Sequence, residues 1–130
     1  MRQLFLVPLL WLIAVALHAA PLAPPVRAEV DALLSALERS GCEFNRNGSW
    51  YAAKEARTHL LRKLEYLEGR NAVQSTEQFI DLAASTSSSS GKPYLVRCGK
   101  AAPVESRAWL GAQLVALRGP AGTPASGPRP

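Results

Sequence analysis

Four serines at residues 87–90, followed by Gly91 and Lys92, form the stretch of this sequence whose residue types most suggest chemistry. A phosphate-cradling loop has the spacing G-x-x-x-x-G-K-[ST] and connects a strand to a helix. Here there is one glycine, Lys92 precedes Pro93, and the expected order is helix, loop, strand. Without a helix N-terminus to receive the anion, the stretch does not predict a nucleotide site.

A serine nucleophile is the second chemistry that this loop suggests. Ser89 and Lys92 satisfy S-x-x-K, but that motif needs both residues on one helix, and Gly91 and Pro93 oppose a helix there. A loop serine activated by His59 is the remaining form of this hypothesis, because serine needs a base within hydrogen-bond reach. We keep a small serine hydrolase as an alternative function.

Anion binding is the third possible function. His59 and Lys63 suggest it, because they lie one helical turn apart and therefore on the same face of the predicted helix. With an arginine beside a tight turn and the hydroxyls of the serine loop, they could hold a carboxylate or a phosphate. The alternative is structural, with a half-buried His59 and a Lys63 whose stem lies along the helix. The predicted ligand-binding residues are Arg46, His59, Lys63, Ser88, Ser90 and Tyr94. A single histidine in the domain predicts no metal site, and we expect no cofactor.

The N-terminus has the pattern of a secretory signal peptide, expected to span residues 1–20. Arg2 precedes an apolar run over residues 4–17, which is shorter than the roughly 20 residues that a membrane span needs. Small residues follow, so we place cleavage between Ala16 and Ala23, most plausibly after Ala19. An uncleaved anchor is the alternative. The sequence therefore predicts a periplasmic or secreted protein.

Cys42 and Cys98 both follow the expected leader. An even number of cysteines in an oxidising compartment favours a disulfide, and the pair is too small a set for structural zinc. Such a bond would hold the strand after the first helix beside the strand after the third.

The domain is expected over residues 28–118, ahead of a disordered tail rich in Gly, Pro and Ala at residues 119–130. The pattern predicts helices over residues 28–41, from Ser49 to Gly69, from Ser75, and from about Ser106, with short strands before Asn47-Gly48 and at residues 93–98. This gives an α+β fold of about four helices on a two- or three-stranded sheet.

Apolar residues at helical spacing predict which positions of these helices face the core. They are Val30, Leu33, Leu34 and Leu37 in the first helix, Phe79, Leu82 and Ala83 in the third, and Trp109, Leu110, Leu114 and Leu117 in the last. Ser75 is expected to cap the third helix, with Gln78 as the return partner of a capping box.

The net charge of +5 is dispersed along the chain, without an arginine-rich run that alternates with aromatic residues. We therefore predict no nucleic-acid binding. Expected partners are an envelope protein or a small anionic ligand, and we expect no stable membrane span once the leader is removed.

Several short pieces of the domain resemble a family of small exported proteobacterial proteins of unknown function. The pieces are F-x-R-N-G at residues 44–48, H-L-x-x-K at residues 59–63, Phe79-Ile80, and S-S-x-S-G-x-x-Y at residues 87–94. The resemblance implies export and a shared fold, and it brings no activity with it. We expect a non-catalytic binding or interaction module; a purely structural envelope protein is a further alternative.

Overall fold

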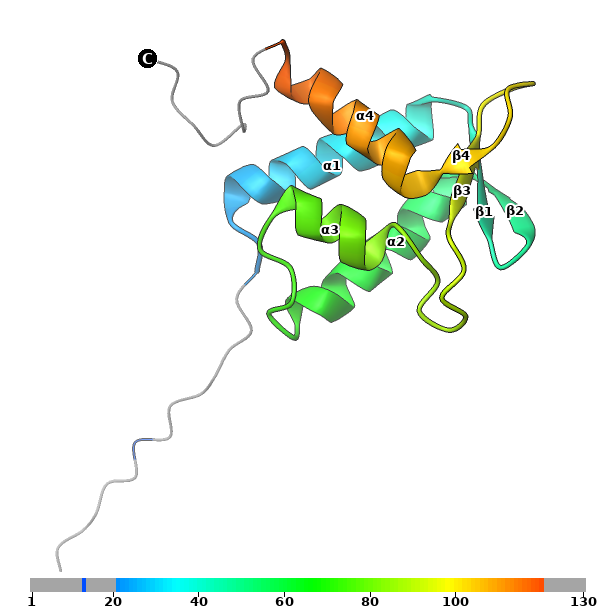
Figure 1. Cartoon of the computed structure of the whole chain (residues 1–130). Coiled ribbons are helices and arrows are strands. Elements are labelled where there is room, and N and C mark those ends of the chain that lie inside the picture. The colour runs from blue at the N-terminus through cyan, green and yellow to red at the C-terminus, as the bar shows by residue number, and fades with distance from the viewer. Residues whose placement is uncertain (1–12, 14–20, 121–130) are drawn as a thin grey trace, which may run out of the picture.

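The computed structural model describes residue 13 and residues 21–120 (Figure 1). The predicted leader, apart from Ile13, and residues 121–130 of the predicted tail lie outside the described residues. The elements in order are α1 (Pro24–Arg39), β1 (Glu43–Arg46), β2 (Ser49–Ala52), α2 (Ala53–Glu68), α3 (Thr76–Ala83), β3 (Leu95–Arg97), β4 (Val104–Glu105) and α4 (Ser106–Arg118).

The four helices pack beside a small antiparallel sheet whose strand order is β2-β1-β3-β4, and the sheet lies at one end of the molecule (Figure 1). The α+β class, the four helices and the pairing of β1 with β3 are confirmed. The sheet has one strand more than expected. Strand β4 contains only two residues, which is too short for the alternation of apolar and polar residues by which strands are recognised.

The expected helix start at Ser49 is wrong, because Ser49 pairs with Arg46 as the first residue of β2. Asn47 and Gly48 both have positive φ, 52° and 85°, as a two-residue hairpin turn requires. The chain therefore turns back against β1, and α2 begins four residues later. Ala52 is its N-cap and makes no side-chain capping bond.

The core lies between the helices and one face of the sheet. Helix α1 buries the predicted stripe of Val30, Leu33, Leu34 and Leu37. The sheet contributes Phe44 and Val96, and Tyr94, just before β3, is buried beside them. Two predicted core positions are wrong, since Leu82 and Leu117 are 49% and 46% exposed. Leu82 lies on the outer side of α3. Ile80, two residues earlier, is buried in its place.

Helix α1 begins at Pro24, earlier than the helix start expected at residue 28. Pro24 and Pro25 occupy its first turn, where the fixed φ of proline suits a helix and no backbone donor is lost. Leu22, just ahead of the helix, is already buried in the core.

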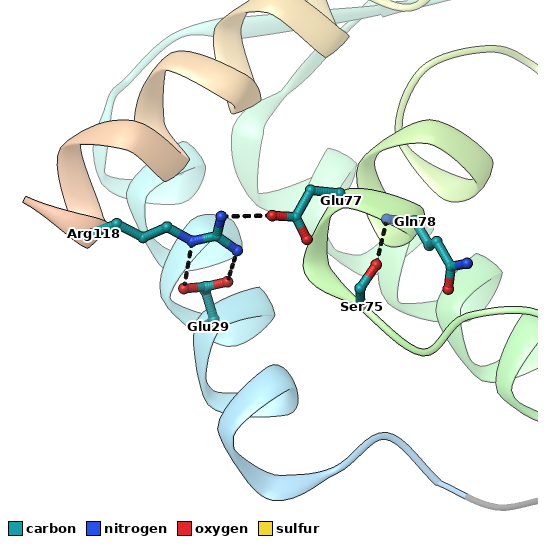
Figure 2. Close-up of polar contacts among 5 residues, drawn as sticks. All are labelled: Glu29, Ser75, Glu77, Gln78 and Arg118. Atoms are coloured by element: carbon teal, nitrogen blue, oxygen red, sulfur yellow. Dashed lines mark hydrogen bonds and ion pairs between the residues drawn. The ribbon is translucent and has the colours of Figure 1, made fainter. Parts of the chain in front are cut away.

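Ser75 caps α3 as predicted, because its Oγ accepts a hydrogen bond of 3.1 Å from the backbone N–H of Gln78 (Figure 2). The return bond differs from the expected capping box. Gln78 Oε1 accepts from the backbone N–H of Gln74, at 2.7 Å, instead of from Ser75. The side chain of Gln78 therefore also fixes Gln74, the residue before the N-cap.

The predicted disulfide between Cys42 and Cys98 is present, with the two Cα atoms 4.3 Å apart. It joins the residue before β1 to the residue after β3. Cross-linking residues separated by 56 positions removes chain entropy from the unfolded state, worth about 4 kcal/mol in the chain-entropy account. Among the described residues, no helix is long and apolar enough to cross a bilayer.

Arg118, the last residue of α4, is held between two carboxylates from α1 and α3 (Figure 2). Its Nε and Nη2 donate to both oxygens of Glu29, at 3.2 and 2.8 Å, and its Nη1 pairs with Glu77. The side chains of Glu29 and Arg118 are only 7% and 15% exposed. Together the three side chains connect three helices, and the bidentate pair of Arg118 with Glu29 lies in a partly desolvated place, where such geometry is most effective.

Hydrogen bonding to Arg118 lowers the pKa of Glu77 below its ordinary value of 4.5. A lowered pKa means that the folded state binds fewer protons than the unfolded state near that pH. The contribution of Glu77 to stability is therefore complete above pH 4.5 and is lost as the pH falls through the lowered pKa.

The replacement Arg118→Met should lower the free energy of unfolding by about 3 kcal/mol, because it removes the cation from a buried bidentate pair. The matched control is Arg107→Met, since the pair of Arg107 with Asp81 also joins α4 to α3 but is 61% and 54% exposed. The control should cost no more than about 1 kcal/mol. Urea unfolding at pH 7 measures both, and equal losses in the two variants would contradict this assignment.

Candidate functional site

A continuous chain of polar contacts joins four of the six predicted ligand-binding residues. Arg46 Nη1 lies 2.6 Å from His59 Nδ1, and His59 Nε2 lies 3.1 Å from the Tyr94 hydroxyl. Lys63 Nζ donates to the same hydroxyl at 3.0 Å. Residues that are far apart in the sequence thus form one network, which runs from the hairpin to the segment before β3.

The sheet and α2 position this network. Arg46 is the last residue of β1, and the cross-strand neighbour of that strand is β3, which begins directly after Tyr94. His59 and Lys63 lie one turn apart on α2, so both can reach the phenol. The Tyr94 ring packs against Phe44 with 5.0 Å between centroids and is 1% exposed. The core therefore fixes the Tyr94 ring, and its hydroxyl is the shared partner of His59 and Lys63.

The partners of His59 determine where its ring carries a proton. A guanidinium can only donate, so Nδ1 must accept from Arg46 and the proton of the neutral ring must sit on Nε2. Nε2 then donates to the Tyr94 oxygen, which also accepts from Lys63. The arrangement requires a neutral imidazole, because a protonated Nδ1 would face the guanidinium as a second donor.

Electrostatics agree with this assignment. Burial, and after it the nearby cations with Arg46 foremost, lower the pKa of His59 from its ordinary 6.5 to about 4. Burial also lowers the pKa of Lys63 and raises the pKa of Tyr94. At neutral pH the imidazole and the phenol are therefore uncharged, and the positive charge of the cluster resides on its arginine and lysine.

The serine loop closes over one side of the network. Lys63 Nζ donates to the backbone carbonyl of Thr86 at 2.9 Å, which attaches the start of the loop to α2. Ser90 Oγ donates to Asn47 Oδ1 at 2.6 Å, which attaches the loop to the hairpin turn. Ser88 is exposed and, among the described residues, its hydroxyl has no hydrogen-bond partner. Ser90 therefore positions the loop, while Ser88 lies outside the network.

The geometry of the described residues does not form a Ser–His pair. Both ring nitrogens of His59 are occupied, one by Arg46 and the other by Tyr94. The hydroxyls of Ser87 and Ser89 are 3.1 Å from each other. No described serine is thus placed for activation by the imidazole. The described residues also contain no group of three or more His, Cys, Asp or Glu side chains that could hold a metal ion.

A cavity of about 280 Å³ opens between the hairpin and α2, and it is lined by Arg46 and His59 but not by Lys63. Phe44 and Ala56 supply apolar lining, and Tyr51 stands beside them. The Arg46 guanidinium lies 5.1 Å from the centre of the Tyr51 ring, so the ring and His59 both hold it in place. The remaining lining is polar: Arg46, Glu55, Thr58, His59 and Arg62.

Of the predicted ligand-binding residues, only Arg46 and His59 line this cavity. Four further lining residues were not predicted from the sequence: Tyr51, Glu55, Thr58 and Arg62. A signal for three of them exists, because positions 55, 58, 59 and 62 follow one another on a single face of α2. Tyr51 gave no such signal, because the sequence predicts a helix from Ser49 onward and Tyr51 lies in β2. Lys63 and Tyr94 form the support behind the cavity.

The titration of His59 should make the domain sensitive to mild acid. Because its pKa is lowered, its contribution to stability is complete above pH 6.5 and is lost as the pH falls from 6.5 to about 4. The free energy of unfolding measured with urea should therefore drop between pH 6.5 and 4.5, before Glu77 titrates. A His59→Gln variant should lack this drop, and an imidazole that titrates near 6.5 by NMR would contradict the prediction.

Comparison with known proteins gives the family of this chain. Residues 24–118 match the model of a family of unknown function, DUF5329. The uncharacterized protein YfeK of Salmonella typhimurium is 44% identical over 68 residues, which are 52% of this chain and 55% of that protein. The chain thus matches little more than half the length of that relative. No solved structure matches. Since the family match spans all the helices and strands described above, the chain belongs to the family of unknown function DUF5329.

Proposed function

We propose that this protein is an exported, non-catalytic binding module that takes a small anion, a carboxylate or a phosphate, in the cavity between the hairpin and α2. The observation that carries the proposal is the fixed guanidinium of Arg46 at the cavity wall. Guanidinium donors match the oxygens of both anions, and one N–H of Arg46 is used by His59.

Preorganisation makes Arg46 a better candidate than the other basic residues. A flexible surface arginine loses rotamer entropy when it binds a ligand, at a cost of about 1 kcal/mol. Arg46 has already been immobilised by His59 and the Tyr51 ring. Arg62 adds a second positive charge at the cavity rim.

The neutral state of His59 also supports an anion site. A neutral Nδ1 accepts from Arg46 without lowering the positive charge of the guanidinium, and a carboxylate in the same place would neutralise that charge. The histidine therefore orients the cation and leaves its charge available to a ligand. The cavity volume, at the small end of ligand sites, favours a small molecule over a large one.

Export is the second part of the proposal. The signal-like N-terminus and the Cys42–Cys98 disulfide support it, since disulfides persist in oxidising compartments. Buried Leu22 further favours cleavage ahead of that residue, because a cut after Ala23 would remove part of the core.

Anion binding is tested by NMR titration of the uniformly ¹⁵N-labelled protein with inorganic phosphate and, separately, with succinate. We expect shifts at the cavity residues, and Arg46→Gln should weaken binding at least about tenfold because it removes the fixed cation. The matched control is Arg70→Gln, an exposed arginine that stacks on Tyr66 and lies outside the cavity. Equal weakening in both variants, or no binding of either anion, would overturn the anion site and favour a structural envelope protein.

Export is tested by expressing the chain with its own N-terminus in a Gram-negative host. The mature protein should be recovered from the periplasm with an N-terminus ahead of Leu22, and alkylation should find no free thiol. A version that starts at Pro21 should stay in the cytosol with both cysteines reducible. Full-length protein with free thiols in the cytosol would contradict export.

A further inference from the structure

The cavity also carries a negative charge that a site for a plain anion does not require. Glu55 lines the same wall of α2 as Arg62, and both side chains are exposed at the rim. Among the described residues neither takes part in a salt bridge or a side-chain hydrogen bond, whereas most other carboxylates of the domain are paired with arginine.

Spacing explains why Glu55 and Arg62 do not pair with each other. Residues seven apart on a helix share a face but are separated by about 10 Å along the axis. His59, which holds Arg46, lies between them, about 6 Å from Glu55 along the same axis. The cavity therefore has a negative end at Glu55 and a positive end at Arg46 and Arg62.

We propose that the ligand is a zwitterion of dipeptide length, whose ammonium group binds Glu55 and whose carboxylate binds Arg46 and Arg62. This proposal rests on the anion site proposed above and names its ligand class. An extended peptide advances about 3.5 Å per residue, so two residues span the distance from Glu55 to the level of Arg46. A single amino acid, whose ammonium and carboxylate share one carbon, is too short to reach both ends.

The middle of the cavity suits the apolar part of such a ligand. Phe44 and Ala56 form its apolar lining, and the Tyr51 ring stands beside Arg46. Small side chains of a dipeptide can lie against this lining while the two termini reach the charged ends. The ligand would then be oriented by charge at both ends, because the reversed orientation places like charges together.

Glu55 has a competing structural explanation, since it lies in the first turn of α2, where a carboxylate complements the helix dipole. A stability measurement alone would not separate the two roles. A test must therefore ask whether Glu55 recognises the ammonium group of a ligand.

The test compares four probes by calorimetry or NMR titration: alanyl-alanine, N-acetyl-alanyl-alanine, alanyl-alanine amide and free alanine. Alanyl-alanine should bind at least about tenfold more tightly than each of the other three, which lack one charge or the length. Glu55→Gln should reduce the affinity for alanyl-alanine to that for the acetylated peptide and leave the acetylated peptide unchanged. The matched control Glu65→Gln, an exposed acid of α2 outside the cavity, should change neither affinity.

Each other result has a defined meaning. If the acetylated peptide binds as tightly as alanyl-alanine and both depend on Arg46, the zwitterion is wrong while the anion site stands. If free alanine binds as tightly as the dipeptide, the ligand length is wrong. If Arg46→Gln changes none of the affinities, both the zwitterion and the proposed function fail.

Discussion

The pairing of β1 with β3, fastened by the Cys42–Cys98 disulfide, is the contact on which the rest of the structure depends. It joins two segments that lie about fifty residues apart in the sequence, and such non-local contacts carry a loop-closure cost that the covalent bond offsets. The outer strands β2 and β4 attach to this central pair. The pair also places Arg46 at the end of β1 and Tyr94 directly before β3, so the fold and the candidate site share one constraint.

The polar network of Arg46, His59, Lys63 and Tyr94 is anchored in the core at Tyr94 and reaches the cavity at Arg46 and His59. Tyr94 is buried and holds two donors, Lys63 secures the serine loop, and only Arg46 and His59 reach the cavity. Buried polar groups that are fully hydrogen-bonded fix a unique geometry, since any other arrangement leaves one of them unsatisfied. The orientation of Arg46 therefore depends, through His59, on Tyr94 and Lys63, which do not line the cavity.

Features governed by local chemistry were predicted from the sequence, and features governed by packing were not. The stripe of Val30, Leu33, Leu34 and Leu37, the Asn47-Gly48 turn and the Ser75 cap each depend on neighbours within a few residues. The proximity of Arg46, His59, Lys63 and Tyr94 could be anticipated because the cysteines suggested which strands meet. The cavity could not, since β2 displaced the expected helix start and brought Tyr51 opposite α2. Leu82 and Leu117 are exposed because neighbouring helices cover only part of the apolar face of each short helix.

The ion pair between Arg118 and Glu29 has a consequence for how the domain can be attached to other structures. It brings the end of α4 against the early part of α1, at the pole of the molecule away from the hairpin (Figure 1). A membrane anchor or a neighbouring module joined ahead of Pro24 or beyond Arg118 would hold the domain by that pole. The hairpin, which forms one wall of the cavity, would then lie at the end of the domain away from the tether, whichever terminus served as the tether.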